Sequence, residues 1–240
     1  MKNEKHSQQE YYTKTASLYD AMHIQEIEHD TALLYILHFV RTLEIKNLLD
    51  VGSGTGRAIQ FFLKNEPLVK IMGIEPVENL ITQAIEKNKI PKELFVCANG
   101  EHLPFENNSF DAVCALGVMH HTKYPNVVIK EMTRVAQKAI FISDSNRFGQ
   151  GLMATRWLKL ILYKIGLWPL VNFIKTMGRE YAISEGDGIA YSYSVFDSYK
   201  ILAKWADRII LIPTAQHQEK SWFSPLLSSS HILICAIKNA

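Results

Sequence analysis

The sequence predicts an α/β fold in which a mostly parallel, doubly wound sheet carries helices on both faces. Three observations predict it. Short apolar runs of strand type alternate with longer segments whose apolar residues recur at helical spacing. The first run, Asn47–Val51, ends in a turn with glycine at every second position, Gly52, Gly54 and Gly56. The fourth run, Phe110–Leu116, is apolar almost throughout, as a central parallel strand requires.

The same patterns predict the individual elements. Helices are expected at 26–43, 58–64, 77–87, 127–135 and 195–205, and strands at 47–51, 70–74, 94–98, 110–116, 139–143, 208–214 and 231–238. The Tyr-rich stretch 11–20 favours a further helix, used either for packing or as a cap over a ligand. Gly166 and Pro169 are expected to split the apolar stretch 148–178 into two helices. The glycine-hinged stretch 180–194 suits either a loop that closes over a ligand or a surface hairpin.

At 240 residues and 27.4 kDa, the chain suits one α/β domain with an elaboration. We expect a helical N-terminal cap (1–45), a core (46–147), a lid or insertion (148–195), and a closing helix with a strand pair (196–240). The formal net charge of +2 indicates no strong attraction to nucleic acid or acidic membranes. Residues 1–10 show no secretory signal, and a cytoplasmic location is expected.

The three cysteines lie in strand-like runs, at Cys97, Cys114 and Cys235, without C-x-x-C spacing. An odd number of cysteines without that spacing argues against a disulfide framework or a zinc site. We therefore expect buried, reduced thiols.

The glycine turn predicts a ligand site at the carboxyl end of the first strand. Glycine lets backbone approach a ligand closely, and the helix that follows offers free N–H groups. The dinucleotide fingerprint is excluded because Arg57 stands where its third glycine belongs, and no Gly-Lys-Ser/Thr follows for a P-loop. Glu75, about 20 positions further on, ends the second strand. Its carboxylate can accept hydrogen bonds from both ribose hydroxyls of an adenosine-containing ligand.

Two segments carry a resemblance to a known family. The D-x-G-x-G-x-G pattern of residues 50–56 resembles motif I of the class I S-adenosylmethionine-dependent methyltransferases. Residues 98–111 resemble the A-D-A-E-x-L-P-F-x-x-x-S-F-D segment of the group that includes the ubiquinone and menaquinone C-methyltransferases and small-molecule O-methyltransferases. The resemblance implies a Rossmann-like seven-stranded sheet with an antiparallel last strand. It also implies S-adenosyl-L-methionine as cofactor and S-adenosyl-L-homocysteine as product.

The resemblance also implies a set of donor-binding residues. In that group an acid after the third strand bonds the adenine amino group; Asn99 replaces it here, and its amide oxygen can still accept that hydrogen bond. The expected cofactor site comprises Tyr19, Asp50, Gly52, Ser53, Gly54, Gly56, Glu75, Pro76, Asn99, Gly100, Glu101, Leu116 and Val118.

The loop 117–121 lies between cofactor and acceptor in the resembled group, which makes His120 and His121 the catalytic candidates. An imidazole with a pKa near 6.5 can take a proton from an attacking hydroxyl. Alternatively, both histidines only pack or orient. They make a poor metal site without clustered cysteines or carboxylates, so no metal is expected. Substrate candidates are Tyr12, Asp144, Asn146, Arg147, Tyr191 and Tyr193; those after the fifth strand could equally be turn or capping residues.

The acceptor is expected to be a small molecule. Residues 116–121 lack the Asn/Asp-Pro-Pro-Tyr/Phe pattern typical of nucleobase amino methylation, and the chain lacks a basic stripe, so no nucleic-acid partner is expected. The His-containing loop favours O-methylation of a polar metabolite or sugar-type acceptor. C-methylation of a lipid-like ring is the alternative, motivated by the apolar stretch 148–178. A cofactor-binding protein without catalysis is a third possibility.

The apolar stretch 148–178 has three open roles: enclosing the acceptor, forming a dimer face or lying on a membrane. Arg156, Lys159, Lys164 and Lys175 interrupt it, so no uncharged run reaches the ~18 residues of a membrane span. Because these cations do not fall on one narrow helical face, a lid or dimer packing is favoured over membrane contact through 151–178. The chain is expected to be a monomer or a homodimer.

Overall fold

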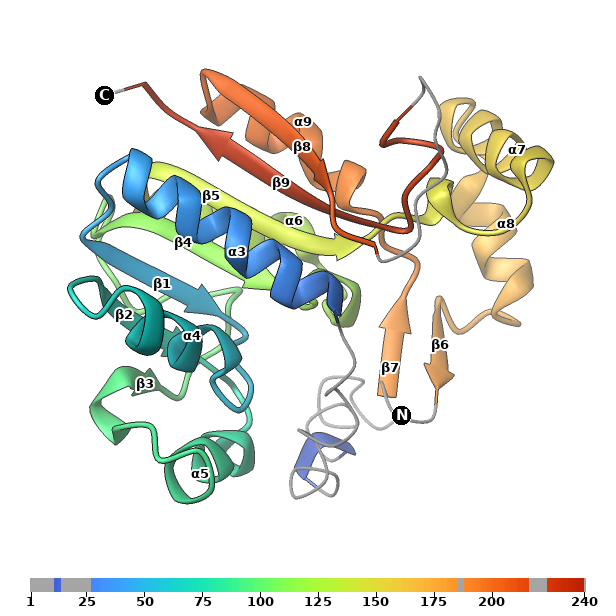
Figure 1. Cartoon of the computed structure of the whole chain (residues 1–240). Coiled ribbons are helices and arrows are strands. Elements are labelled where there is room, and N and C mark those ends of the chain that lie inside the picture. The colour runs from blue at the N-terminus through green and yellow to red at the C-terminus, as the bar shows by residue number, and fades with distance from the viewer. Residues whose placement is uncertain (1–10, 14–26, 185–187, 216–223, 240) are drawn as a thin grey trace.

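The computed structural model describes residues 11–13, 27–184, 188–215 and 224–239. Its centre is a seven-stranded sheet in the order β3-β2-β1-β4-β5-β9-β8 (Figure 1). The strands are β1 Asn47–Val51, β2 Lys70–Ile74, β3 Phe95–Val96, β4 Phe110–Leu116, β5 Ala136–Ser145, β8 Arg208–Pro213 and β9 His231–Ile237. The first five run parallel, and β9 lies antiparallel between β5 and β8. The predicted doubly wound sheet with an antiparallel last strand is confirmed.

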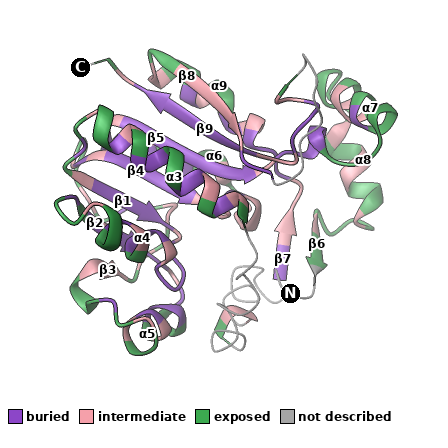
Figure 2. Ribbon diagram, viewed as in Figure 1, coloured by how far each residue is buried: buried purple, intermediate pink, exposed green. Residues whose placement is uncertain are grey.

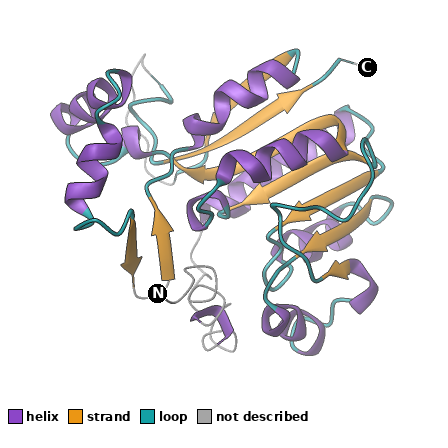
Figure 3. Cartoon of the chain, turned by 180° about the vertical axis from the view of Figure 1, so that it is seen from behind, coloured by secondary structure: helices purple, strands orange, loops and turns teal. Residues whose placement is uncertain are grey.

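Helices cover both faces of the sheet (Figures 1 and 3). They are α3 Ile27–Thr42, α4 Arg57–Asn65, α5 Glu78–Glu86, α6 Pro125–Val135 and α9 Val195–Trp205. Successive strand residues point to opposite faces. Leu48 packs with the cluster that includes α3 and α4, whereas Leu49 packs with the cluster that includes α6 and α9. The central strands β1, β4, β5 and β9 are therefore buried between two apolar layers and are largely purple in Figure 2, whereas the edge strand β8 is only partly buried.

The glycine turn after β1 is held tightly against β2. The backbone N–H groups of Gly52 and Ser53 both donate to the carbonyl of Ile74, at 2.8 and 2.9 Å. Gly52 has φ +76°, and a Cβ placed there would lie 2.5 Å from Val118 Cγ2. At Gly56, with φ +86°, a Cβ would lie 2.3 Å from Ile90 Cδ1. Both positions therefore require glycine for backbone conformation and for space.

Three local predictions need correction. The third strand covers only Phe95–Val96, because it is an edge strand paired with two residues of β2. Cys97, just beyond it, is exposed instead of buried, whereas Cys114 and Cys235 are buried. The fifth strand is longer than predicted, since β9 continues to pair with it as far as Ser145. Asp144 therefore lies within a strand, not in the loop after it.

Residues 153–184 and 188–191 form two helices and a pair of antiparallel strands beyond the carboxyl end of β5 (Figures 1 and 3). The helices are α7 Met153–Lys164 and α8 Trp168–Lys175, separated at Gly166 as predicted, with Pro169 in the first turn of α8. The hairpin pairs β6 Tyr181–Ser184 with β7 Gly188–Tyr191. Within the described residues, no single helix has the length and apolar character of a membrane span. The pair α7 and α8 together has the length and apolar composition of a span, but the two helices meet at a bend of 119°.

Candidate active site

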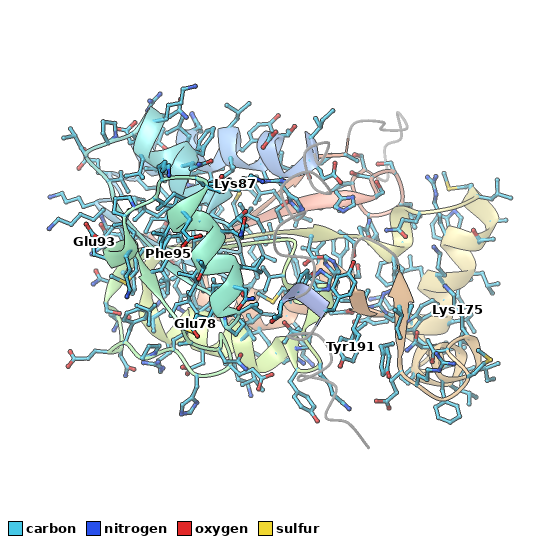
Figure 4. The ribbon with its side chains drawn as sticks, turned by 90° about the horizontal axis from the view of Figure 1, so that it is seen from below. Glu78, Lys87, Glu93, Phe95, Lys175 and Tyr191 are labelled. Carbon is cyan, nitrogen blue, oxygen red and sulfur yellow. The ribbon has the colours of Figure 1, made fainter. Side chains whose placement is uncertain are left out.

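A cavity lies at the carboxyl ends of the central strands, bounded by the glycine turn, the loops after β2, β3 and β4, and the hairpin strand β7. Many of the predicted site residues meet there. Those that line it are Tyr12, Gly52, Glu75, Pro76, Asn99, Gly100, Glu101, Val118, His121 and Tyr191. Figure 4 labels Tyr191 on β7 at this end of the molecule, between α5 and the α8 side chain of Lys175. Segments more than 100 residues apart in the sequence thus form one site.

Glu75 is the buried acid of the cavity. Its Oε2 accepts the backbone N–H of Gly54 at 2.9 Å, and its Oε1 accepts that of Val77 at 3.0 Å. These bonds fix the carboxylate between the glycine turn and the start of α5. Each oxygen keeps a second lone pair for a ligand hydroxyl. Burial raises the pKa of Glu75 to about 7, because desolvation outweighs the two backbone hydrogen bonds.

Asp50 lies directly beneath the turn and does not line the cavity. It is buried, and its Oδ1 accepts the Cys114 thiol at 3.6 Å. Burial raises the pKa of Asp50 to about 7, and its charge contributes to the raised pKa of Glu75. Ser53, Gly54, Gly56 and Leu116 likewise build the turn and the end of β4 without lining the cavity.

The two buried carboxyls make stability depend on pH. Both hold their protons up to about pH 7 in the folded chain, whereas their ordinary pKa values are 3.8 and 4.5. The free energy of unfolding is therefore expected to fall as the pH rises from about 4 to about 7. Asp50→Asn should flatten this decline and be up to about 4 kcal/mol more stable than the wild type above pH 7. Urea unfolding between about pH 4 and pH 7 measures the free energy of unfolding of both proteins. An equal decline with pH in the wild type and in Asp50→Asn would contradict the expectation.

Asn99 and its neighbours form the wall next to β3. The amide oxygen of Asn99, expected to bind the adenine amino group, accepts the backbone N–H of Glu101 at 3.0 Å. Its second lone pair can still accept a ligand donor. A Cβ on Gly100 would lie 2.9 Å from Val51 Cγ1, so glycine lets this loop close against β1. Val77 and Leu80, which pack with Tyr12, add an apolar surface to the cavity.

His121 lies in the cavity with both ring nitrogens bonded. Its Nδ1 lies 2.8 Å from the carbonyl oxygen of Ile189 on β7. A carbonyl only accepts hydrogen bonds, so Nδ1 carries the proton. In the neutral ring Nε2 is then the basic nitrogen, and the Tyr12 hydroxyl donates to it at 3.1 Å. The hairpin thus selects the tautomer whose lone pair points toward Tyr12.

His120 is held by Asp144 instead of facing the cavity. Its Nδ1 lies 2.8 Å from Asp144 Oδ1, while Asp144 Oδ2 accepts the backbone N–H of Met119 at 2.9 Å. Burial acts to raise the pKa of Asp144, but the charge and hydrogen bond of His120 lower it by more than burial raises it. The pKa of Asp144 is therefore below its ordinary value. The rings of His120 and His121 lie 3.9 Å apart between centroids. Asp144 therefore fixes the loop that carries His121.

The remaining predicted substrate residues have partners within the protein and do not line the cavity. Asn146 is fully buried, and its amide nitrogen donates to the carbonyls of Leu226 and Ser229 at 2.7 and 2.8 Å. Arg147 pairs with Asp197, and the Tyr193 hydroxyl bonds Ser198. Substrate contact by these three residues stays a prediction that this geometry does not support. Tyr19 lies outside the described residues.

Several residues of the cavity were not predicted from the sequence: Val51, Val77, Leu80, Gly117, Thr122, Lys123, Val128 and Ile189. Gly117 lies in the predicted loop 117–121, and Thr122 and Lys123 follow it directly, so extending that loop by two residues could have found them. Val77 and Leu80 follow Glu75-Pro76 directly and could have been inferred as the apolar start of α5. Ile189 carries no such signal, because its role comes from the hairpin and its backbone carbonyl.

A sheet of this order, with a glycine turn after β1 and a buried acid after β2, is the donor-binding arrangement of the class I S-adenosylmethionine-dependent methyltransferases. Residues 49–141 match the model of a family described as a methyltransferase domain. This segment, about two fifths of the chain, is therefore similar to a methyltransferase domain.

Individual proteins agree with this assignment. The chain is 29% identical over 122 residues to an uncharacterized methyltransferase of Schizosaccharomyces pombe, covering 47% of this chain and 43% of that protein. It is 36% identical over 91 residues to a probable tRNA methyltransferase of Bos taurus, covering 37% and 18%. The structure of magnesium protoporphyrin IX methyltransferase from Synechocystis, solved with S-adenosylmethionine bound, aligns with a TM-score of 0.59 at 14% identity, covering 100% and 99%. The chain spans about half or less of the length of these curated relatives.

Proposed function

We propose that this chain transfers the methyl group of S-adenosylmethionine to an oxygen atom of a small polar acceptor, such as a sugar. The observation that carries the proposal is His121, which faces the donor cavity with its basic Nε2 exposed to a hydroxyl partner. The Tyr12 hydroxyl occupies the place where an acceptor hydroxyl would bond.

The cavity suits the donor. Glu75 offers two carboxylate oxygens to ribose hydroxyls, and Asn99 offers an amide oxygen to the adenine amino group. Gly52 and Gly100 line the cavity, and their bare backbone can approach a ligand closely there. When bound, the cofactor supplies an electrophilic methyl group, and its transfer leaves S-adenosylhomocysteine.

In the proposed reaction, the chain's residues align the acceptor and take up its proton. The acceptor oxygen forms the new bond to the methyl carbon while the carbon–sulfur bond breaks and its electron pair stays on sulfur. The acceptor proton passes to Nε2 of His121, and the Ile189 carbonyl stabilises the resulting imidazolium through Nδ1–H. Tyr12 and the hairpin strand β7 close the site around the acceptor, which limits the geometries it can adopt.

The experiment combines calorimetry with methyl transfer. We expect S-adenosylmethionine to bind, and its isotope-labelled methyl group to appear on oxygen when sugars and other hydroxylated metabolites are supplied. Gly52→Val is the matched blocked variant, since the added side chain would meet Val118, and it should lose both signals. Donor binding with transfer to carbon would instead support the alternative. Absence of donor binding in the folded chain would refute the proposal.

The alternative is C-methylation of a lipid-like ring. It is favoured by the similarity of residues 98–111 to the ubiquinone and menaquinone methyltransferases, and by the apolar residues Val118, Val128 and Ile189 in the cavity. A tRNA acceptor is a second alternative, suggested by relatives named as a probable tRNA methyltransferase and a tRNA U34 carboxymethyltransferase. Their similarity spans about 90 residues, so it supports a shared donor core more than a shared acceptor. Purified tRNA added to the same assay tests it.

A further inference from the structure

The helix α7 has apolar side chains toward solvent and two of its three cations, Arg156 and Lys159, toward the protein. Leu158 and Ile161 are 54% and 53% exposed, and Ile165, just beyond the helix, is 61% exposed. They recur at the i, i+3, i+7 spacing of one helical face. Arg156, by contrast, is buried and donates to the carbonyls of Gly151 and Leu227 at 2.7 and 2.8 Å. This is the reverse of an ordinary surface helix.

The helix α8 also exposes apolar side chains. Leu170, Phe173 and Ile174 lie on one helical face at i, i+3 and i+4, Met177 lies just beyond the helix, and between 54% and 78% of each is exposed. Figure 2 shows α7 and α8 mostly in the colour of exposed residues. Residues 152–177, which contain the two helices, carry twelve of the 21 exposed large apolar side chains in the described parts of the chain. Contiguous apolar surface of this kind marks an interaction site.

The charged residues between Ser145 and Arg179 are all cationic. From Ser145 to Arg179 the sequence contains no Asp or Glu, whereas Lys164, Lys175 and Arg179 are exposed at the ends of the two helices. Lys159 turns inward, where its Nζ donates to the carbonyl of Gln150 at 2.7 Å. The solvent-facing surface of α7 and α8 is thus apolar in its middle and cationic at its edge.

We propose that α7 and α8 dock this chain on the surface of an anionic lipid bilayer. At 12 and 8 residues, each helix is too short to cross a membrane but long enough to lie in its interface. The apolar face enters the acyl boundary, and the exposed lysines and arginine meet the acidic headgroups. Charge complementarity favours this occupant over a second copy of the chain, whose identical cations would be brought together across a symmetric contact.

The docking surface is connected to the acceptor side of the cavity. Trp168 at the start of α8 donates through Nε1 to the Ser192 hydroxyl at 3.0 Å, and Arg147 donates to the Ser192 carbonyl at 2.8 Å. Ser192 directly follows β7, which supplies Ile189 and Tyr191 to the cavity. Docked helices would thus hold the acceptor wall beside the bilayer. The docking itself does not depend on methyl transfer.

Vesicle co-sedimentation tests the proposal with the full chain. We expect sedimentation with vesicles of equal parts phosphatidylcholine and phosphatidylglycerol, and none with phosphatidylcholine alone. The pair Ile161→Asp with Phe173→Asp should lower the partition coefficient by about tenfold or more. Its matched control is Leu34→Asp with Leu68→Asp, since these leucines are 62% and 89% exposed but lie elsewhere. The control should bind like the wild type.

Charge reversal completes the test. Lys175→Glu with Arg179→Glu should weaken binding to the anionic vesicles by about tenfold or more, and Lys64→Glu with Lys92→Glu should not. Calorimetry with S-adenosylmethionine confirms that each variant remains folded. Equal sedimentation with both vesicle types, or equal losses in test and control variants, would overturn the proposal. So would a dimer seen by light scattering that Ile161→Asp dissociates, with no vesicle binding.

Discussion

Replacement of His121 by alanine is expected to lower kcat by about a hundred- to ten-thousand-fold, the usual contribution of a general base. The reason is the position of its Nε2, which faces the cavity while Nδ1 is held by the Ile189 carbonyl. Affinity for S-adenosylmethionine should change little, because the carboxylate and amide that would bind the nucleoside belong to other loops. Steady-state methyl transfer and calorimetry measure the two quantities separately.

Chemical rescue distinguishes a base from a packing residue. Free imidazole should restore part of the activity of His121→Ala, since it can occupy the vacated space and accept the proton. His120→Ala is the matched comparison: this ring is bonded to Asp144 and does not line the cavity, so its loss should not be rescued. An unchanged kcat in His121→Ala would remove the general base from the mechanism.

Replacement of Glu75 by alanine is expected to weaken S-adenosylmethionine binding by at least about a hundredfold. Two hydrogen bonds to a charged acceptor contribute about 1.5–3 kcal/mol each. The alanine variant would also leave the N–H groups of Gly54 and Val77 without their partner. Glu75→Gln keeps one acceptor oxygen and should lose less. Calorimetry gives Kd, and thermal unfolding confirms that the variants fold.

The pH dependence of binding sharpens this test. Burial raises the pKa of Glu75 to about 7, and the ionised form is the better acceptor of two ribose hydroxyls. Affinity for the donor should therefore rise as the pH increases through about 7, and Glu75→Gln should abolish the rise. Asp50→Asn should move the rise to lower pH, because it removes a neighbouring negative charge. Equal donor affinity in wild type and Glu75→Ala would exclude Glu75 from the site.

The donor side of the site was predictable because its signals are local in sequence. The glycine spacing and the acid that ends the next strand each follow a strand directly, and parallel strands bring their carboxyl ends to one edge. Gly52, Glu75 and Asn99 accordingly lie around one cavity. Side-chain direction was harder to predict. Asp144 was expected to meet the substrate, but it bonds His120, 24 residues earlier in the chain.

The region after β5 was predicted in its elements but not in its orientation. Gly166 and Pro169 separate two helices as expected. Apolar periodicity, however, identifies the apolar face of a helix without showing whether that face packs on the protein core or lies at the surface. Ile161 and Phe173 face solvent, and among the described residues that line the cavity none belongs to α7 or α8. The hairpin strand β7 lines the site instead, and it belongs to the stretch 180–194 that was expected either to close over a ligand or to form a surface hairpin.

The hydrogen bond between His121 and the Ile189 carbonyl links acceptor size to reactivity. An acceptor that displaces β7 would remove the carbonyl that accepts the Nδ1 proton of the proposed base. The ring could then tautomerise and present an N–H where a lone pair is required. A bulky acceptor would thus be methylated slowly even if it could bind. Selectivity against such molecules should appear in kcat before it appears in KM.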